Sequence, residues 1–157
     1  MSKNILGQLK KGGQKMKVKI TRIDKSLPLP EYQTKGSVAF DLYSRIDIEI
    51  KPQEIVLIPT NFIIQTPKGY MLILASRSSS PIKLGLRVSN GIGIIDQDYC
   101  GPKDEIKLQV QNFTNQTVKI NKGQRIGQAS FIKTSKAKWQ EIDQIQNNSR
   151  GGFGSTG

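Results

Sequence analysis

An all-β fold, either a sandwich or a barrel, is the class that this sequence predicts, and three observations predict it. Short runs alternate apolar with polar residues, which is the pattern of a strand with one buried face. Denser apolar runs lie between them and are typical of strands buried on both faces. Turn residues, mainly proline, glycine and asparagine, separate these runs at short intervals, and no internal repeat is present.

The expected strands follow in chain order. Alternating runs occupy residues 18–20 and 46–50, and the dense runs 55–58, 62–64 and 70–74 come next. A glycine-rich and isoleucine-rich stretch follows Asn90, and alternation returns at 106–110 and 118–120 before a last strand at 129–132. Only residues 137–145 have the length for a helix, and their apolar pattern is poor.

Length and composition exclude several classes of protein. The 157 residues fit one domain, and no apolar run approaches the roughly 18 residues that a membrane span needs. The absence of histidine removes Ser-His-Asp and Cys-His catalysis, so acid–base work must fall to Asp, Glu, Lys or Tyr. The single cysteine, Cys100, suits a reducing compartment, and we expect a cytoplasmic protein. The net charge of +12 favours polyanionic partners.

Three segments are expected along the chain. Residues 1–16 are basic, lack apolar periodicity and predict a mobile tail, and residues 17–145 carry the β pattern. Residues 146–157 hold four glycines and one large apolar residue, Phe153, and cannot bury enough surface to fold alone. This last segment is therefore either a disordered tail or a flexible arm that orders on a ligand.

The segment from Asn90 to Tyr99 carries the first chemical signal. Its Asp-Gln-Asp-Tyr string is compatible with an ordinary hairpin turn. In a functional interpretation, the glycines of two flanking strands let the backbone approach a flat ligand, and Asp96 orients a water molecule at the end of the slot.

Three further segments combine arginine, hydroxyl and carboxylate groups. The stretch 75–80 places Arg77 beside a row of serines, which is either a turn with satisfied hydroxyls or a phosphate cradle. Arg125 and Gln128 lie at the start of the last expected strand. Asp41 lies inside an apolar strand, and because burying an unpaired carboxylate is costly, we expect Arg77 or Arg125 as its partner.

The end of the chain combines one aromatic ring with cationic and hydroxyl groups among glycines. Phe153 can stack on a base, and the arginine and hydroxyls can bind phosphates. The residues expected to act in this way are Arg150, Phe153, Gly154, Ser155 and Thr156.

Taken in chain order, these five segments resemble the five motifs of the trimeric dUTPase family, and the resemblance extends from residue 17 to residue 157. Gly-Ile-Ile-Asp with Asp-Tyr-x-Gly is similar to the third motif, and Gly-Phe-Gly-Ser-Thr-Gly to the fifth. Three departures occur: Ser76 replaces the usual proline, Ser79 the usual glycine and Gly127 the usual alanine. The arginine of the fifth motif usually lies further upstream than Arg150.

The resemblance implies a jelly-roll β-barrel or sandwich, assembled as a homotrimer with active sites at subunit interfaces. It implies hydrolysis of dUTP to dUMP and pyrophosphate, which keeps uracil out of DNA and supplies dUMP. Asp96 would orient and deprotonate the attacking water, and Gln128 would help to place it. Mg²⁺ would be held mainly by the triphosphate, with Asp41 in contact through water.

The implied substrate contacts divide by the part of the nucleotide. Uracil lies against Asn90, Gly93, Ile94, Ile95 and the main chain of Lys107, and Tyr99 packs on the deoxyribose where a 2′-hydroxyl would not fit. The phosphates lie against Arg77, Ser78, Ser79 and Arg125. The arm closes with Phe153 over uracil and with Arg150, Gly154, Ser155 and Thr156 around the phosphates.

Two alternatives stay open at this point. A dCTP deaminase shares this fold, although its C-terminal segment differs. A nucleic-acid-binding β domain would suit the basic charge, although interleaved aromatics are scarce. Nucleic acid is not required by the hydrolase interpretation, which leaves room only for weak binding, and no membrane partner is expected.

Overall fold

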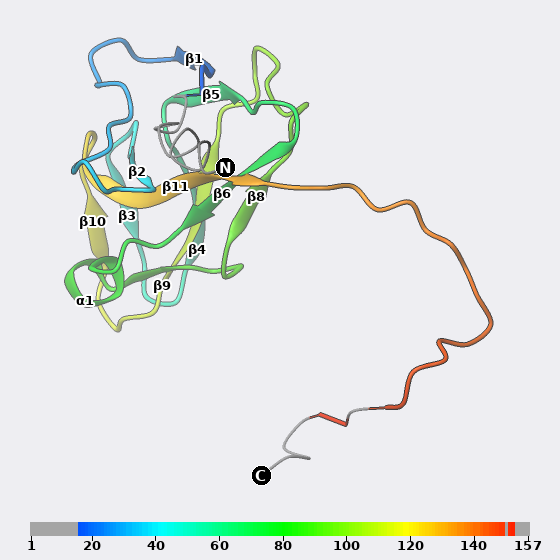
Figure 1. Ribbon diagram of the computed structural model, residues 1–157. Coiled ribbons are helices and arrows are strands. Elements are labelled where there is room, and N and C mark those ends of the chain that lie inside the picture. The colour runs from blue at the N-terminus through cyan, green and yellow to red at the C-terminus, as the bar shows by residue number, and fades with distance from the viewer. Residues whose placement is uncertain (1–15, 150, 153–157) are drawn as a thin grey trace, which may run out of the picture.

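The computed structural model describes residues 16–149 and 151–152, and it confirms the all-β class (Figure 1). One short helix accompanies the strands in this part of the chain. No helix among the described residues is both long and apolar enough to cross a membrane. The elements are β1 (Lys19–Arg22), β2 (Phe40–Tyr43), β3 (Ile48–Ile50), β4 (Ile55–Pro59), β5 (Phe62–Gln65), β6 (Tyr70–Ala75), α1 (Ser80–Leu84), β7 (Leu86–Val88), β8 (Gly93–Ile95), β9 (Lys107–Asn112), β10 (Val118–Ile120) and β11 (Arg125–Lys133).

The described strands pair in four antiparallel sheets. The largest has the order β2-β11-β6-β8, and a second has the order β4-β9-β7. Two pairs, β1-β5 and β3-β10, complete the framework. Neighbours in the sheets are often distant in sequence, since β11 lies between β2 and β6. The core therefore forms only when remote segments meet, as in a jelly-roll sandwich.

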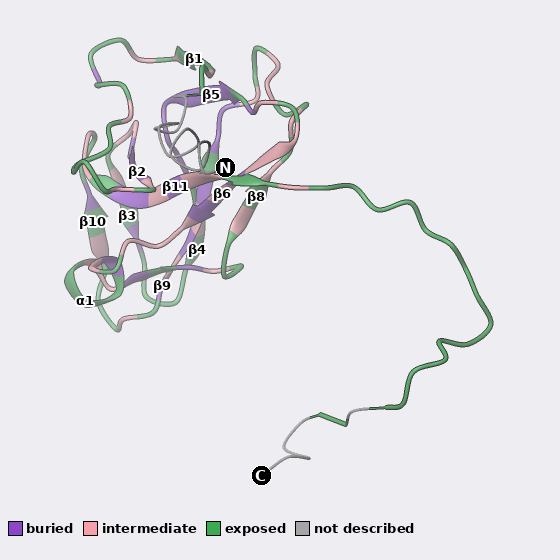
Figure 2. Cartoon of the chain, viewed as in Figure 1, coloured by how far each residue is buried: buried purple, intermediate pink, exposed green. Residues whose placement is uncertain are grey.

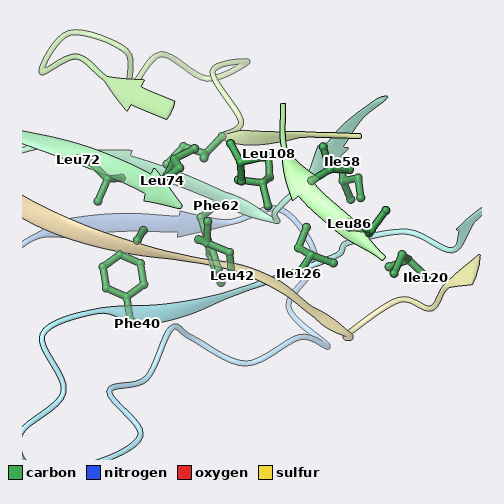
Figure 3. Close-up of a cluster of buried hydrophobic side chains, with 14 of the residues drawn as sticks. Phe40, Leu42, Ile58, Phe62, Leu72, Leu74, Leu86, Leu108, Ile120 and Ile126 are labelled. Atoms are coloured by element: carbon green, nitrogen blue, oxygen red, sulfur yellow. The ribbon is translucent and has the colours of Figure 1, made fainter. Parts of the chain in front are cut away.

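The core lies between these sheets (Figures 2 and 3). Leu42, Leu74 and Ile126 come from the four-stranded sheet and meet Ile58 and Leu108 from the three-stranded sheet. Each of these side chains is at most 2% exposed. Because strand side chains alternate between faces, β9 buries every second residue, as the sequence pattern predicts.

The dense apolar runs do not all behave as predicted. Phe62–Gln65 buries three consecutive residues, which confirms a strand covered on both faces. In β4, however, Ile55 and Leu57 are each 55% exposed, so the prediction for residues 55–58 is wrong. Only one face of this strand is buried, and Ile58 on that face packs in the core. The other face, with Ile55 and Leu57, is exposed to solvent in the single chain.

Two further predictions about elements need correction. Residues 137–145 form no helix; the chain after β11 runs away from the sheets as an exposed, extended segment (Figure 1). The helix that is present, α1, has Pro81 in its first turn and ends at Gly85 with φ of 64°. It has only five residues, which is too short to show a helical period.

Candidate functional site

An ion-pair cluster joins the segments that contain Asp41, Arg77 and Arg125. The Asp41 carboxylate lies 2.8 Å from Arg77 Nε and 3.2 Å from Arg125 Nη1, so both predicted partners are confirmed. Its side chain is 8% exposed, and two guanidinium groups compensate the cost of burying its charge. Since an arginine carries five N–H donors, each still has donors to offer an anion.

Sheet register places Gln128 in the same cluster. Gln128 in β11 pairs with Asp41 in β2 on one side and with Ala75 at the end of β6 on the other. Directly opposite residues share a face of the sheet, so the amide and the carboxylate are neighbours. The Gln128 Nε2 donates to Ser76 O at 2.9 Å, which ties the strand to the serine loop.

The serine loop leaves β6 and leads into α1. Ser78 is exposed, and Ser79 is half-buried with φ of −86°, an ordinary right-handed conformation. The backbone at this position therefore accepts a serine without strain where the related motif has glycine. Ser76 Oγ accepts a hydrogen bond from Val88 N at 3.0 Å, a tie to β7 that a proline would not make.

Two residues of this region were not predicted to matter. Ser76 was noted only as a departure from a motif, yet its hydroxyl anchors the loop. Tyr43 lies opposite Arg125 in the β2-β11 ladder, and burial and the nearby Asp41 raise the pKa of its hydroxyl. The signal for Tyr43 was its position two residues after Asp41, which puts both side chains on one face of the strand.

Gly127 makes a close packing contact beside the cluster. A Cβ at this position would lie 2.6 Å from Leu108 Cδ2 and 3.1 Å from Ala75 O, and Leu108 is 1% exposed. The alanine of the related motif would therefore press into a closed core in this chain.

We expect Gly127→Ala to lower the free energy of unfolding by about 1–3 kcal/mol through this overpacking. Urea unfolding measures the change. Gly36→Ala is the matched control, because no atom lies within 4 Å of the added methyl there. Equal stabilities for the two variants would contradict the packing argument.

The segment from Asn90 to Tyr99 lies at another part of the sheet. Asn90 is exposed in a turn, Gly91 has φ of 78°, and Gly93–Ile95 forms β8 on the edge of the large sheet. The strands on either side of the Asp-Gln-Asp turn do not form a hairpin: β8 pairs with β6, whereas β9, which starts at Lys107, pairs with β4 and β7. The segment therefore joins two sheets, and Lys107, exposed at the start of β9, belongs to the other one.

Asp96 directly follows β8 and is exposed. With Asp98 it lines a cleft of about 480 Å³ that also contains Thr134 and Lys136. A larger cleft of about 830 Å³ lies between β1, β2 and β11. It is lined mostly by apolar side chains and, among the residues that the structure describes, contains none of the predicted site residues, so the chemistry points to the smaller cleft.

The two groups of predicted residues are far apart within one chain. Asp41 is in β2 and Asp96 follows β8, the two edge strands of the four-stranded sheet. Three strand spacings separate these edges by about 14 Å. The two groups are also displaced along the strands. In β6, Leu72 is the partner of Ile95 and Ala75 is the partner of Gln128, and these two β6 residues are three positions, or about 10 Å, apart. One chain thus presents two separate groups of predicted residues, the Asp41 cluster and the Asp96 segment, which we call the two half-sites.

The described residues offer no ready-made metal cage. Among the described residues, no group of three or more His, Cys, Asp or Glu side chains could hold a metal ion. Both Asp41 oxygens face arginines, which leaves them poorly placed for direct coordination. This arrangement fits an ion that keeps its waters and takes most of its ligands from substrate phosphates, as Mg²⁺ commonly does. The predicted contacts of Arg150, Phe153, Gly154, Ser155 and Thr156 lie outside the described residues.

Comparison with known proteins gives consistent matches. A model of the family described as dUTPase matches residues 25–157. A deoxyuridine 5'-triphosphate nucleotidohydrolase of Dictyoglomus turgidum is 43% identical over 148 residues, which span 90% of this chain and 99% of that protein. One from Helicobacter pylori strain P12 is 38% identical over 144 residues, which span 90% of this chain and 97% of the relative.

Solved structures agree with the fold. The crystal structure of dUTPase from Streptococcus mutans has a TM-score of 0.70 at 32% identity and covers 76% of this chain and 98% of its own. The dUTPase of Staphylococcus bacteriophage 80alpha with dUPNHPP has a TM-score of 0.80 at 22% identity, with 90% and 98% covered.

Proposed function

The chain belongs to the dUTPase family, and from this premise we propose that it hydrolyses dUTP to dUMP and pyrophosphate. The observation that carries the proposal is the cluster of Asp41, Arg77, Arg125 and Gln128. Three segments remote in sequence bring these motif residues into contact through ion pairs and strand register. In the cytoplasm, this reaction would keep uracil out of DNA and supply dUMP.

We place the complete active site between copies of the chain in a homotrimer. The arginine cluster and the Asp96 segment lie at opposite edges of one sheet, too far apart for one nucleotide to meet both in a single chain. In a closed ring of three copies, the same head-to-tail contact repeats three times. Each contact would bring the Asp41 edge of one chain against the Asp96 edge of its neighbour.

The base and sugar are assigned to the segment after β7. Uracil lies against Asn90, the Gly93–Ile95 backbone and the main chain of Lys107. Asn90 is exposed and free to present its amide, and Ile94 is 57% exposed on this edge. Tyr99 packs on the deoxyribose.

The phosphates are assigned to the arginine cluster. Arg77 and Arg125 have N–H donors beyond those that meet Asp41, and Ser78 and Ser79 directly follow Arg77 in the loop. The C-terminal arm would close over the nucleotide through Arg150, Phe153, Gly154, Ser155 and Thr156 and exclude bulk water.

The reaction is attack of water on the α-phosphorus. Asp96 accepts a proton from the water while the water oxygen bonds to the α-phosphorus. The bond between the α-phosphorus and the oxygen that bridges it to the β-phosphate breaks, and pyrophosphate leaves with that oxygen. Asp96 is exposed at a cleft, so a water molecule can reach it. Gln128 orients the water or the α-phosphate through its amide.

Mg²⁺ is the proposed cofactor, and it would neutralise charge on the triphosphate. The substrate phosphates would hold it for the most part, and Asp41 would contribute through a water molecule. A dUTPase of phage phi11 is described as coordinating a structural Mg(II) ion, which is consistent with magnesium in this fold.

Release of pyrophosphate from each deoxynucleotide in the presence of Mg²⁺ tests the proposal. We expect release from dUTP and loss of it when the metal is chelated. Ammonia from dCTP would instead identify a deaminase, and salt-sensitive DNA binding without turnover would identify a nucleic-acid-binding domain. Either outcome would overturn the proposed function.

A further inference from the structure

An ion pair between the half-buried Arg45 and the buried Glu105 lies beside Tyr99. Glu105 is 7% exposed, and its carboxylate accepts from Arg45 Nε at 2.8 Å and from Arg45 Nη2 at 2.9 Å. The bond to Glu105 raises the pKa of Arg45, so the guanidinium holds its proton firmly. A two-point contact of this kind fixes direction as well as distance.

Asn61 also donates a hydrogen bond to this carboxylate. The Asn61 backbone N–H donates to Glu105 Oε1 at 2.9 Å. Asn61 is fully buried with φ of 77°, a conformation that non-glycine residues rarely adopt. Its side chain accepts from Asp24 N at 2.6 Å and donates to Asp24 O at 3.0 Å, which holds the residue in this conformation.

The backbone next to Glu105 is held as tightly. Ile106 O accepts from both the amide and the hydroxyl of Thr60, at 3.0 and 2.7 Å, and Ile106 N donates to Phe62 O at 2.9 Å. The Glu105 side chain and the following peptide are thus fixed at once. Glu105 O is therefore a rigid acceptor.

Tyr99 makes use of this acceptor. Its hydroxyl donates to Glu105 O at 3.3 Å, while 39% of the residue is exposed. No other partner of this hydroxyl occurs among residues 16–149 and 151–152. The hydroxyl end of the exposed Tyr99 ring is thereby held in place by the hydrogen bonds that fix Glu105.

We propose that Arg45, Glu105 and Asn61 form a positioning network that holds the Tyr99 ring and sets the preference for deoxyribose over ribose. The proposal rests on the proposed function, in which Tyr99 packs on the sugar. A 2′-hydroxyl is one small group, so its rejection depends on a wall that cannot move aside. A ring without its Glu105 contact would swing and admit ribose.

The ratio of kcat/KM for dUTP to kcat/KM for UTP, measured by pyrophosphate release, tests the network. We expect Glu105→Gln to lower this ratio by about tenfold, because an amide oxygen that replaces Oε1 leaves the amide nitrogen facing Arg45 Nη2, donor against donor, and removes the charge of the pair. Tyr99→Phe should lower it similarly. The double variant should lose little more than either single variant, because both changes remove one linkage.

Milder and matched variants separate positioning from stability. Arg45→Lys keeps the charge but loses the two-point contact, and it should lower the ratio in the same direction. Asn112→Ala removes buried hydrogen bonds to Ile50 O and Gln116 O, so it should lower Tm without changing the ratio. Glu49→Gln makes the same chemical change in the exposed pair with Lys119 and should change neither.

Two results would overturn the inference while leaving the proposed function intact. One is an unchanged ratio in Tyr99→Phe. The other is a ratio in Glu105→Gln and Arg45→Lys that stays at the wild-type value while Tm falls as it does in Asn112→Ala. A wild-type chain that releases no pyrophosphate from dUTP would overturn the proposed function and this inference with it.

Discussion

Asp96→Asn is expected to lower kcat for dUTP by about 10²–10⁴-fold, the range that a positioned general base contributes. The amide keeps the shape of the side chain but cannot accept the proton of the attacking water. Asp96 is exposed beside a cleft and makes no ion pair among the described residues, so the fold and nucleotide binding should change little. Steady-state turnover and equilibrium binding of dUTP measure the two effects separately.

Asp47→Asn is the matched control for this experiment. Asp47 Oδ1 accepts from Lys122 N at 2.8 Å, and an asparagine oxygen can accept the same bond. The control removes one negative charge without touching either half-site, and its kcat should stay near the wild-type value. Near-normal turnover in Asp96→Asn would contradict the assignment of the base.

Removal of residues 150–157 is expected to lower turnover by about 10²-fold or more while leaving the unfolding transition in place. The shortened chain ends at Ser149 and retains every described strand, the core and both half-sites. It loses the aromatic, cationic and hydroxyl groups that are proposed to close over the nucleotide. Thermal unfolding and pyrophosphate release, measured on one preparation, separate these effects.

A chain that lacks residues 1–15 is the matched truncation. The removed residues are basic and lie at the other end of the chain, and none of them is a predicted substrate contact. The turnover of this shortened chain should therefore stay near that of the full chain. Undiminished activity after the C-terminal truncation would contradict a closing arm.

Much of the strand framework could be predicted because its signals are local. Period-two alternation in β9 and turn residues around β3 and β10 need no knowledge of the partner strand. Whether a strand face is buried depends on segments that are remote in sequence. This explains the error at Ile55 and Leu57, because a dense apolar run does not show which of its faces another element will cover. Strand pairing is equally non-local, so the sequence could not show that β7 and β8 part into different sheets.

The chemistry of the candidate site was more predictable than its assembly. Burying a carboxylate in an apolar strand is costly unless a cation pairs with it, and Asp41 forms ion pairs with both predicted arginines. The distance between the Asp41 cluster and Asp96 follows from sheet order, which no single motif encodes. The part played by Glu105 was hidden too, because its link to Tyr99 runs through a main-chain carbonyl.

A mixing experiment with two inactive variants tests most directly whether copies share an active site. Arg77→Gln weakens the phosphate half-site, and Asp96→Asn disables the water half-site. When equal amounts are unfolded and refolded together, about a quarter of the sites in a trimer should combine two intact halves and restore about that share of turnover. Co-assembled trimers that remain as inactive as the separate variants would contradict the shared site.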